Sequence, residues 1–581
     1  MKKVLAFALA LVLVLSVVGC GKQADTPAAN TETAKPSSSS SSTPSSSSST
    51  TTAPTATEEP VKPDESTGVK LEMIDSPFGE FPRYTTPHTQ DMTLIDPTTF
   101  WIGQGQKIES GNPHKGSSSC FYDMVFDRLI EFDLDTGEMT GVIWKDWELA
   151  PDCSYVTFNM NENVTFHTGE NATAEDVFYT LQRCADPSIS GLADKNIFSN
   201  IDFEKSEITG KYSGKIVLKT PSISFLPGLT KCWLLSKSYI EEKGEDNAWW
   251  SNTVGTGAYK VVQVIEGDRY ILKRNDDYWT GEKGPFENIV IRYYAEQATM
   301  FMDYETHNID FMAGPSASDT DRAIQGAVDN TIIEPRSIMA TYSIIFNEEK
   351  GNPALYDVNV RKAIALALDC ETICALSYES LGVPASSVIP VGLPDSVKMA
   401  YEQNIEEAKK ALKEAGYKPG ELELTIGSSN QGGHAKACEC IQGMLDEIGI
   451  KVNIIIADGT VNLQNLRNAG PDVYDMSITN QSFDTLESTN FLGGISHACG
   501  SASFTGATDD KVDEIALAAR AAKTVDEKQA KMRELQTYLS ENYWIIPICE
   551  VKSVLIYRDY LTGVRCLIPR MADIMKLEVV G

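Results

Sequence analysis

Residues 164–181, VTFHTGENATAEDVFYTL, pass from an extended segment through a turn into a helix, and they decide which fold is expected. Alternating side chains over residues 154–160 predict a strand just before them. His167-Thr168-Gly169 has the composition of a turn. Thr173 is a suitable N-cap, because acids follow in the first turn and Asp176 occupies the capping-box position. Apolar side chains then recur at helical spacing, at Val177, Phe178, Leu181 and Cys184.

The longer stretch, residues 122–187, resembles the signature region of the family 5 extracellular solute-binding proteins of ABC transporters. These are the oligopeptide-, dipeptide- and nickel-binding receptors. In that family a strand and turn of the form "yegLi-fd-dtGe" lead to "LA-sWe-s-D" and then to "y-F-L--gv-FhdG---TAeDV". The matching residues here are Asp127-Arg128-Leu129-Ile130, Trp147-Glu148, Thr157-Phe158, residues 164–169 and residues 173–177.

Further blocks follow in the family's order, so the resemblance covers residues 90 to 570. Residues 254–259, VGTGAY, resemble "GTGpY", and residues 274–279, RNDDYW, resemble "rn-dYW". Asn308-Ile309-Asp310 resembles "geiD", and residues 357–364 resemble "dvrVRqAi". A helical pattern over residues 511–539 and the apolar Ile545-Ile546-Pro547 complete the C-terminal third.

This resemblance implies an α/β fold of the periplasmic-binding-protein type (type II), with two lobes, an extra subdomain in the large first lobe, and two hinge crossings. The crossings are expected near residues 342–347, within TYSIIFN, and near residues 545–551. The expected divisions are a signal peptide at 1–19, a lipidated cysteine and disordered tether at 20–68, lobe I with the extra subdomain at 69–342, lobe II at 343–545, and a return to lobe I at 546–581. Hinged lobes that close on a ligand are a common switching geometry.

The first residues, MKKVLAFALALVLVLSVVGC, have the layout of an export signal. Their apolar stretch is shorter than the ~20 residues that a membrane span requires. Val17-Val18-Gly19-Cys20 resembles a lipobox, in which Cys20 is diacylated and becomes the mature N-terminus, and two acyl chains anchor a protein firmly. An ordinary signal peptide with a chance cysteine is the alternative. The Ser-, Thr- and Pro-rich residues that follow are too polar to fold and predict a tether.

Composition limits the class of partner. The chain has 581 residues and a formal net charge of −31, so it is expected to repel nucleic acid and anionic lipid. No later segment is apolar enough to predict a second membrane span. The expected location is therefore the extracellular face of the cytoplasmic membrane, with the body held there by the N-terminal lipid.

The cysteines and histidines predict no metal site and no cofactor. Of the 12 cysteines, Cys370 and Cys374 are four apart, and Cys438 and Cys440 are two apart, but neither pair has the further ligands of a zinc site. His167 is interpreted as a turn residue. His434 and His497 could approach a ligand cleft, although such histidines are more often surface residues.

Residues 481–492, QSFDTLESTNFL, contain the candidate ligand anchor. They resemble the segment "W-aD-nepT-FL" of the oligopeptide receptors, in which an aspartate binds the α-ammonium group of the peptide. Asp484 takes that position, and a carboxylate facing an ammonium forms a strong charge-assisted hydrogen bond. A solvated or structural acid is the alternative.

The neighbouring positions depart from the family pattern. Gln481 stands where the family has tryptophan, Phe483 comes immediately before Asp484, and Ile338 stands where the peptide receptors present a tyrosine. With Asn480, these are the predicted ligand-binding residues. Residues 100–119 have no clear family counterpart and are a candidate for a further wall. A peptide remains the expected ligand, but its length and side-chain preference do not follow.

The predicted function is a monomeric receptor of an ABC importer that captures oligo- or dipeptides by cleft closure and passes them to a permease and an ATPase. The chain has no G-x-S-x-G, H-E-x-x-H or cysteine–histidine arrangement that would indicate an enzyme. The same receptor class could instead take an oligosaccharide or a nickel or other metal chelate, or it could sense a peptide signal.

Overall fold

The computed structural model describes residues 60–77, 79–108, 110–115, 120–189, 195–399, 401–430, 432–466, 470–483, 485–496, 498–499, 509–566 and 573–580. The predicted signal peptide, Cys20 and most of the predicted tether lie outside these residues, as do Asp484 and His497. All of the described residues belong to one compact unit, Ala56–Gly581.

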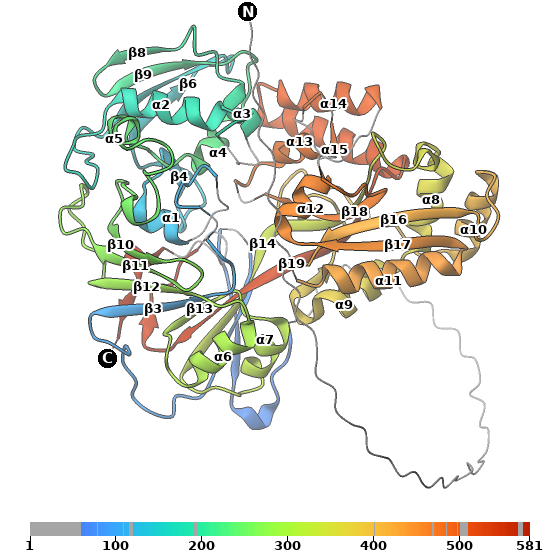
Figure 1. The fold of residues 1–581 in the computed structure, drawn as a ribbon, viewed down its shortest axis with the longest axis horizontal. Helices are drawn as coiled ribbons and strands as arrows, with labels where there is room; N and C mark the ends of the chain where they lie inside the picture. The colour runs from blue at the N-terminus through green and yellow to red at the C-terminus, as the bar shows by residue number, and fades with distance from the viewer. Residues whose placement is uncertain are drawn as a thin grey trace, which may run out of the picture. The chain divides into compact units, whose positions relative to one another are not determined.

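Two long antiparallel strands connect the two halves of the main sheet. They are β14 (Thr331–Phe346) and β19 (Ile545–Arg558), which pair from Thr331↔Arg558 to Ile345↔Ile545. The strand order of the sheet is β10-β11-β12-β3-β13-β19-β14-β18-β16-β17, so β14 and β19 occupy its middle. Figure 1 shows both strands passing from one set of elements to the other.

On one side lies the group of strands that we call the β3 group. It consists of β3 (Thr99–Gln104), β10 (Tyr259–Ile265), β11 (Arg269–Arg274), β12 (Asn288–Tyr293) and β13 (Phe311–Ala313). The hairpin of β1 (Lys70–Ile74) and β2 (Phe81–Thr85) joins β14 beside this group. Helices α6 (Gln297–Glu305) and α7 (Ala317–Ile324) contribute buried side chains to the same core as β13.

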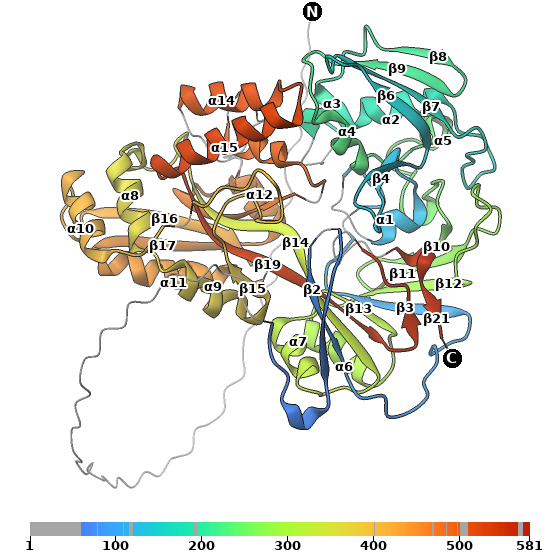
Figure 2. The same ribbon diagram turned by 180° about the vertical axis from the view of Figure 1, so that it is seen from behind.

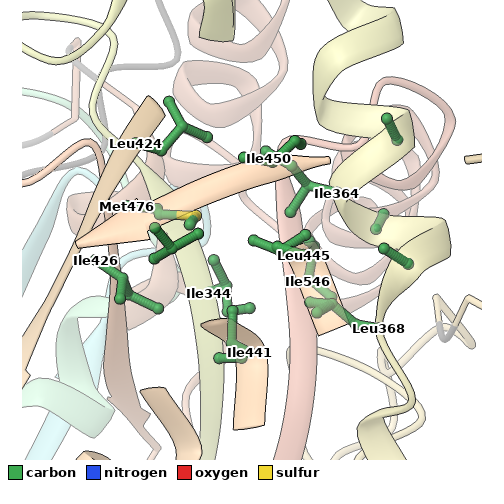
Figure 3. Packing of buried hydrophobic residues seen from close by; sticks show 14 of the residues in the cluster. Ile344, Ile364, Leu368, Leu424, Ile426, Ile441, Leu445, Ile450, Met476 and Ile546 are labelled. Carbon is green, nitrogen blue, oxygen red and sulfur yellow. The ribbon is translucent and has the colours of Figure 1, made fainter. Parts of the chain in front are cut away.

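On the other side lies the β16 group, made of β16 (Leu422–Ser429), β17 (Ile450–Ala457) and β18 (Met476–Ser482). Its helices are α8 (Val358–Ala367), α9 (Cys370–Tyr378), α10 (Ile405–Glu414) and α11 (His434–Glu447). Figure 3 shows their core, in which Ile364, Ile426, Leu445 and Ile546 meet. Burying each of these side chains stabilises the fold by roughly 1.5–3 kcal/mol, so helices and crossing strands are held as one body.

A separate four-stranded sheet carries the predicted strand and helix. Its order is β6-β7-β9-β8, formed by β6 (Trp144–Leu149), β7 (Tyr155–Met160), β9 (Ser213–Val217) and β8 (Glu207–Gly210). Helix α2 (Ala174–Ala185) begins after Thr173, whose backbone N–H donates to the Asp176 carboxylate at 2.9 Å. The strand at 154–160 and the capped helix are therefore confirmed.

The prediction of a single helical run over residues 511–539 is wrong. The structure has two helices, α14 (Asp510–Arg520) and α15 (Val525–Glu541). Thr524 is the N-cap of the second helix and accepts a hydrogen bond from the Glu527 N–H at 3.2 Å. Figure 2 shows both helices beside the β16 group. Their apolar side chains belong to the same core as Ile345 of β14 and Ile545 of β19.

The GTGAY motif is a close-packed loop. A Cβ atom on Gly255 would lie 2.0 Å from the Val125 carbonyl oxygen. Both ring nitrogens of His167 contact this loop, Nε2 at 2.9 Å from the Gly257 oxygen and Nδ1 at 3.2 Å from the Gly255 nitrogen. Burial lowers the pKa of His167 to about 4. The interpretation of His167 as a turn residue is confirmed.

Among the described residues, no helix combines the length and hydrophobicity needed to cross a membrane.

Candidate functional site

The site is built around a break in the crossing strand β14. The pairing of β14 with β19 shifts between Ser337 and Thr341. Within the break Met339 adopts a φ of 49°, in the left-handed region that side chains other than glycine rarely occupy. The predicted site residue Ile338 lies next to it, with 7% of its surface exposed.

The predicted segment 480–483 runs antiparallel to this break. Ala340 pairs with Ser482, Thr341 with Gln481, and Tyr342 with Asn480. The N–H of Phe483 donates to the Met339 carbonyl at 2.7 Å. The structure therefore brings Ile338 and residues 480–483 together, although some 140 positions separate them in sequence.

The side chains in this segment differ in their surroundings. Phe483 is fully buried in a cluster that includes Met339, Phe491 and Leu492. Gln481 is half-buried, and Asn480 is exposed. Asp484 is not among the described residues. Its neighbours in sequence, Phe483 and Thr485, both have fully buried side chains.

One edge of β18 is paired only at its start. Parallel pairing with β16 joins Ile426 to Met476 and Gly427 to Ser477. In the part of the chain that the structure describes, no strand pairs with this edge beyond Ser477. Backbone groups of consecutive residues point to opposite edges of a strand, and Phe483 faces β14. Asn480 and Ser482 consequently direct their N–H and C=O groups toward the unpaired edge.

The chain following Asp484 is anchored by buried polar contacts. The Glu487 carboxylate forms an ion pair with Lys528 of α15 at 3.0 Å, and both side chains are largely buried. Glu487 also accepts from the Thr489 N–H at 3.1 Å, and Ser488 donates to Asp395. Sequence reasoning missed Lys528, because the partner of Glu487 lies 41 positions away.

The loop at residues 385–399 adds a part of the site that the sequence did not indicate. The Val391 N–H donates to the Glu550 carboxylate of β19 at 3.3 Å, while the Val391 side chain is 65% exposed. A Cβ on Gly392 would lie 3.6 Å from the Met339 methyl carbon. Burial raises the pKa of Glu550. An exposed apolar residue and a half-buried acid thus lie beside the break in β14.

His434 is buried rather than open to a cleft. Its Nδ1 lies 3.1 Å from the Tyr378 hydroxyl oxygen. Its ring packs edge-on against the Tyr342 ring, with 4.8 Å between the ring centroids. Burial lowers the pKa of His434 to about 4. This histidine is a packing residue of the β16 group.

A cavity of about 420 Å³ lies beside the turn at residues 133–137. Its lining includes Asp127, Glu131 and Arg565 but none of the predicted ligand-binding residues. Asp127 accepts hydrogen bonds from Tyr278 at 2.8 Å and from Trp279 at 2.7 Å. The last two residues of the RNDDYW motif, Tyr278 and Trp279, therefore hold a buried acid in place.

The family model described as "Bacterial extracellular solute-binding proteins, family 5 Middle" matches residues 138–503. The periplasmic oligopeptide-binding protein OppA of Salmonella typhimurium is 26% identical, over 69% of this chain and 77% of that protein. The di/tripeptide-binding protein 2 of Pseudomonas aeruginosa is 23% identical, over 81% and 92% of the two chains.

Solved structures of periplasmic binding proteins share the fold. Helicobacter pylori DppA in complex with the peptide STSA gives a TM-score of 0.72 at 21% identity, covering 83% of this chain and 98% of that chain. Brucella suis NikA in complex with Fe(III)-EDTA gives 0.71 at 20% identity, covering 83% and 100%. The predicted α/β fold of this class is confirmed.

The family consists of solute-binding proteins and not of enzymes, and its matched region includes the segment at residues 480–483. The match covers more than half of the chain, and the fold agrees with it over the described residues. The chain belongs to the family 5 bacterial extracellular solute-binding proteins.

Proposed function

We propose that this protein captures peptides for an ABC importer and delivers them to a permease and an ATPase. The observation that carries the proposal is the edge of β18 beyond Ser477, with which no described strand pairs and which comes just before Asp484 in sequence. An extended chain can add to such an edge by main-chain hydrogen bonds. The edge lies beside the break in β14, where residues of both crossing strands meet.

Peptide capture at this edge would not depend on the side chains of the peptide. No described strand pairs with the N–H and C=O groups of Asn480 and Ser482, so these groups would bind the backbone of a ligand, which is common to all peptides. Specificity would come from the side chains around the edge, including Gln481, Ile338 and Val391. The exposed Val391 offers apolar contact area, and Gln481 offers an amide.

Asp484 is proposed as the anchor for the peptide α-ammonium group. Its place in sequence, two residues after Ser482, would put the charged terminus of a ligand at the end of the edge. A carboxylate–ammonium contact is roughly twice as strong as a neutral hydrogen bond. The curated relatives named as oligopeptide- and di/tripeptide-binding proteins support a peptide ligand.

We also propose that Cys20 carries the lipid that holds the receptor on the outer face of the cytoplasmic membrane. The lipobox-like residues 17–20 and the polar residues that follow support this arrangement. The expected division into lobe I (69–342), lobe II (343–545) and a return segment (546–581) remains a proposal. In it, ligand binding closes the two lobes about β14 and β19.

The test of the ligand class is a thermal-shift screen on the full chain, stripped of bound ligand by partial unfolding. The panel contains di- to hexapeptides, the same peptides N-acetylated, oligosaccharides and nickel–histidine complexes. A ligand at 100 times its Kd should add roughly 2.7 kcal/mol to the free energy of unfolding. We expect free-amine peptides to stabilise the protein and acetylation to remove most of the effect.

The variant Asp484→Asn removes the charge at the proposed anchor with little change in size. It should lose the response to free-amine peptides, while the matched surface variant Glu402→Gln should retain it. Stabilisation by sugars or metal complexes alone, unchanged in Asp484→Asn, would refute the peptide ligand and the role of Asp484. It would leave the solute-binding family unaffected.

Membrane anchoring has its own test. The variant Cys20→Ala should be found in the medium or soluble fraction, whereas the unmodified chain should sediment with membranes and yield lipid-modified N-terminal peptides by mass spectrometry. An unmodified chain that is released like the variant would contradict the lipid anchor.

A further inference from the structure

Three side chains that are far apart in sequence converge inside the protein, away from the site described above. They are His114, Cys184 at the end of α2, and Cys232, which follows the short helix η2 (Leu229–Lys231). All three have no exposed surface. A ring nitrogen of His114 and the two Sγ atoms all lie within 4.8 Å of one another.

The two ring nitrogens of the histidine differ in their hydrogen bonds. Nε2 lies 3.1 Å from the carbonyl oxygen of Trp233. A carbonyl only accepts, so Nε2 carries the proton and Nδ1 holds a lone pair in the neutral ring. Nδ1 is buried and, among the described residues, forms no hydrogen bond of normal geometry, although the His114 ring does interact with the neighbouring Cys184 thiol. A backbone carbonyl on one imidazole nitrogen is the arrangement that orients the other nitrogen toward a metal.

The sulfur separation also fits a metal ion. The two Sγ atoms are 3.8 Å apart. Two sulfurs that are each about 2.3 Å from a tetrahedral zinc ion lie roughly 3.8 Å from one another. Two thiols in simple contact would show a similar distance, so the sulfurs alone decide nothing. What distinguishes this pair is the imidazole ring beside the sulfurs, one nitrogen of which forms no hydrogen bond among the described residues.

The loop that carries His114 is fixed by a polar network. The side-chain oxygen of Asn112 accepts a hydrogen bond from the backbone N–H of His114 at 2.9 Å. The side-chain NH2 of Asn112 donates to the Glu245 carboxylate at 3.2 Å. Glu245 forms ion pairs with Arg183 at 2.8 Å and Lys115 at 3.4 Å. Arg183 precedes Cys184 on α2, so the same network positions the histidine and one of the cysteines.

We propose that His114, Cys184 and Cys232 bind one thiophilic transition-metal ion, of which Zn²⁺ is the representative. His114 would bind through Nδ1 and each cysteine as a thiolate, so that binding releases the two thiol protons to solvent. Two thiolates and a neutral imidazole balance the charge of a divalent cation. Three protein ligands leave the fourth tetrahedral position to a water molecule.

The metal would join two parts of the fold. Cys184 and Cys232 belong to the core of the four-stranded sheet and α2. Trp233, whose carbonyl orients His114, belongs to the core of the β3 group. The ion would therefore hold the loop at residues 110–115 and the end of α2 together at the meeting point of the two cores.

Metal content of the full chain, purified with a reductant and without chelator, is the first measurement. We expect about one zinc ion per chain that survives dialysis. After exchange for Co²⁺, thiolate-to-cobalt charge-transfer absorption should appear in the near ultraviolet. A chelator should lower the melting temperature of the unmodified chain.

The variant Cys184→Ser/Cys232→Ser and the single variant His114→Gln should each weaken metal retention more than about tenfold. The matched control is Cys374→Ser/Cys549→Ser, a second buried thiol pair, 2.7 Å apart, that has no histidine in its hydrogen-bond contacts. It should keep the metal and the cobalt spectrum.

Three results would overturn the proposal. One is a chain that binds no Zn²⁺ or Co²⁺ when reduced. Another is a Cys184–Cys232 disulfide in the purified protein, found by peptide mass spectrometry. The third is metal that dialysis removes, or that persists in the double variant, because such an ion is adventitious. The cobalt spectrum of the unmodified chain decides the matter even if a variant fails to fold.

Discussion

Position 255 requires glycine because the backbone of Val125 leaves no room for a side chain. The Val125 carbonyl oxygen lies where a side chain would begin, and the Phe126 ring is also within 2.8 Å of that point. The sequence shows the GTGAY motif but not what the glycine faces, since Val125 is 130 positions away. The motif can therefore be recognised in the sequence, but the close contact that requires glycine is known only from the structure.

The variant Gly255→Ala should therefore lower the free energy of unfolding by about 1–3 kcal/mol, because overpacking forces the backbone apart. Chemical denaturation measures this change in the free energy of unfolding. Gly443→Ala is the matched control. Gly443 lies in α11 with nothing within 4 Å of an added Cβ, so alanine there should raise stability by about 0.5–1 kcal/mol. Equal losses at both positions would contradict the steric explanation.

Acid should destabilise the protein partly through His434. Its pKa is about 4 in the folded state, against 6.5 for the ordinary group. The unfolded chain therefore binds the proton more tightly, and stability falls as the pH falls from about 6.5 toward 4. The full effect of one such histidine is on the order of 3 kcal/mol.

Denaturant titrations of His434→Phe between pH 7 and pH 4 should show a smaller loss of stability than the unmodified chain. The variant can keep the ring contact with Tyr342, although it leaves the Tyr378 hydroxyl without this partner. The free energy of unfolding at pH 7 should consequently fall, while its dependence on pH between pH 7 and pH 4 becomes less steep. An unchanged slope would contradict the assignment of a buried neutral histidine.

At the scale of elements, local signals predicted α2 and the strand before it because cap, turn and spacing all lie within 30 residues. The same reasoning missed the division between α14 and α15, although Thr524 and Glu527 form a local cap signal. The length of β14, 16 residues, could not be predicted. Two of its partners, β18 and β19, come more than 100 positions later, and a third, β2, lies well over 200 positions earlier.

The ion pair of Glu487 and Lys528 fastens the segment after Asp484 to α15. Their side chains are 3% and 13% exposed, so removing one partner leaves a buried charge. Lys528→Met should lower the free energy of unfolding by about 3–5 kcal/mol. The double variant Glu487→Gln/Lys528→Met should recover part of this loss, because no unpaired charge remains.

Lys531→Met is the control for this prediction. Lys531 and Glu534 form a pair on the same helix with side chains 41% and 42% exposed. Breaking an exposed pair should cost about 0–1 kcal/mol in the same denaturation assay. Similar losses in the free energy of unfolding for Lys528→Met and Lys531→Met would show that burial of an ion pair does not determine its contribution to stability.

At the scale of the whole molecule, the candidate site is assembled from four distant segments. Residues 338–341, 385–392, 478–483 and 550 converge at the break in β14. Family resemblance pointed to residues 480–483 and to Ile338, because these positions correspond to a known motif. It gave no indication of Glu550, which the pairing of β19 with β14 brings there, or of Val391, which is held by its hydrogen bond to Glu550.

A contact between the four-stranded sheet and the α14–α15 connection offers a test of closure, and it rests on the proposed function. Cys153 Sγ lies 3.3 Å from the Lys523 carbonyl oxygen, and the Ile223 N–H donates to the Ala522 oxygen at 3.1 Å. Cys153 is buried, whereas the Lys523 side chain is exposed. A cysteine introduced at position 523 therefore adds an exposed thiol on the residue whose carbonyl contacts Cys153.

If a bound peptide favours the arrangement seen here, it should speed disulfide formation in Lys523→Cys. Cross-linking requires Cα atoms roughly 4.4–6.8 Å apart, which an open arrangement would not provide. Non-reducing gels and peptide mass spectrometry would follow the bond, and Cys153→Ser in the same background separates it from reactions of the other cysteines. The cross-linked receptor should also release peptide more slowly, because opening is blocked. Equal cross-linking rates with and without peptide would mean that this contact persists in both states and that binding does not move it.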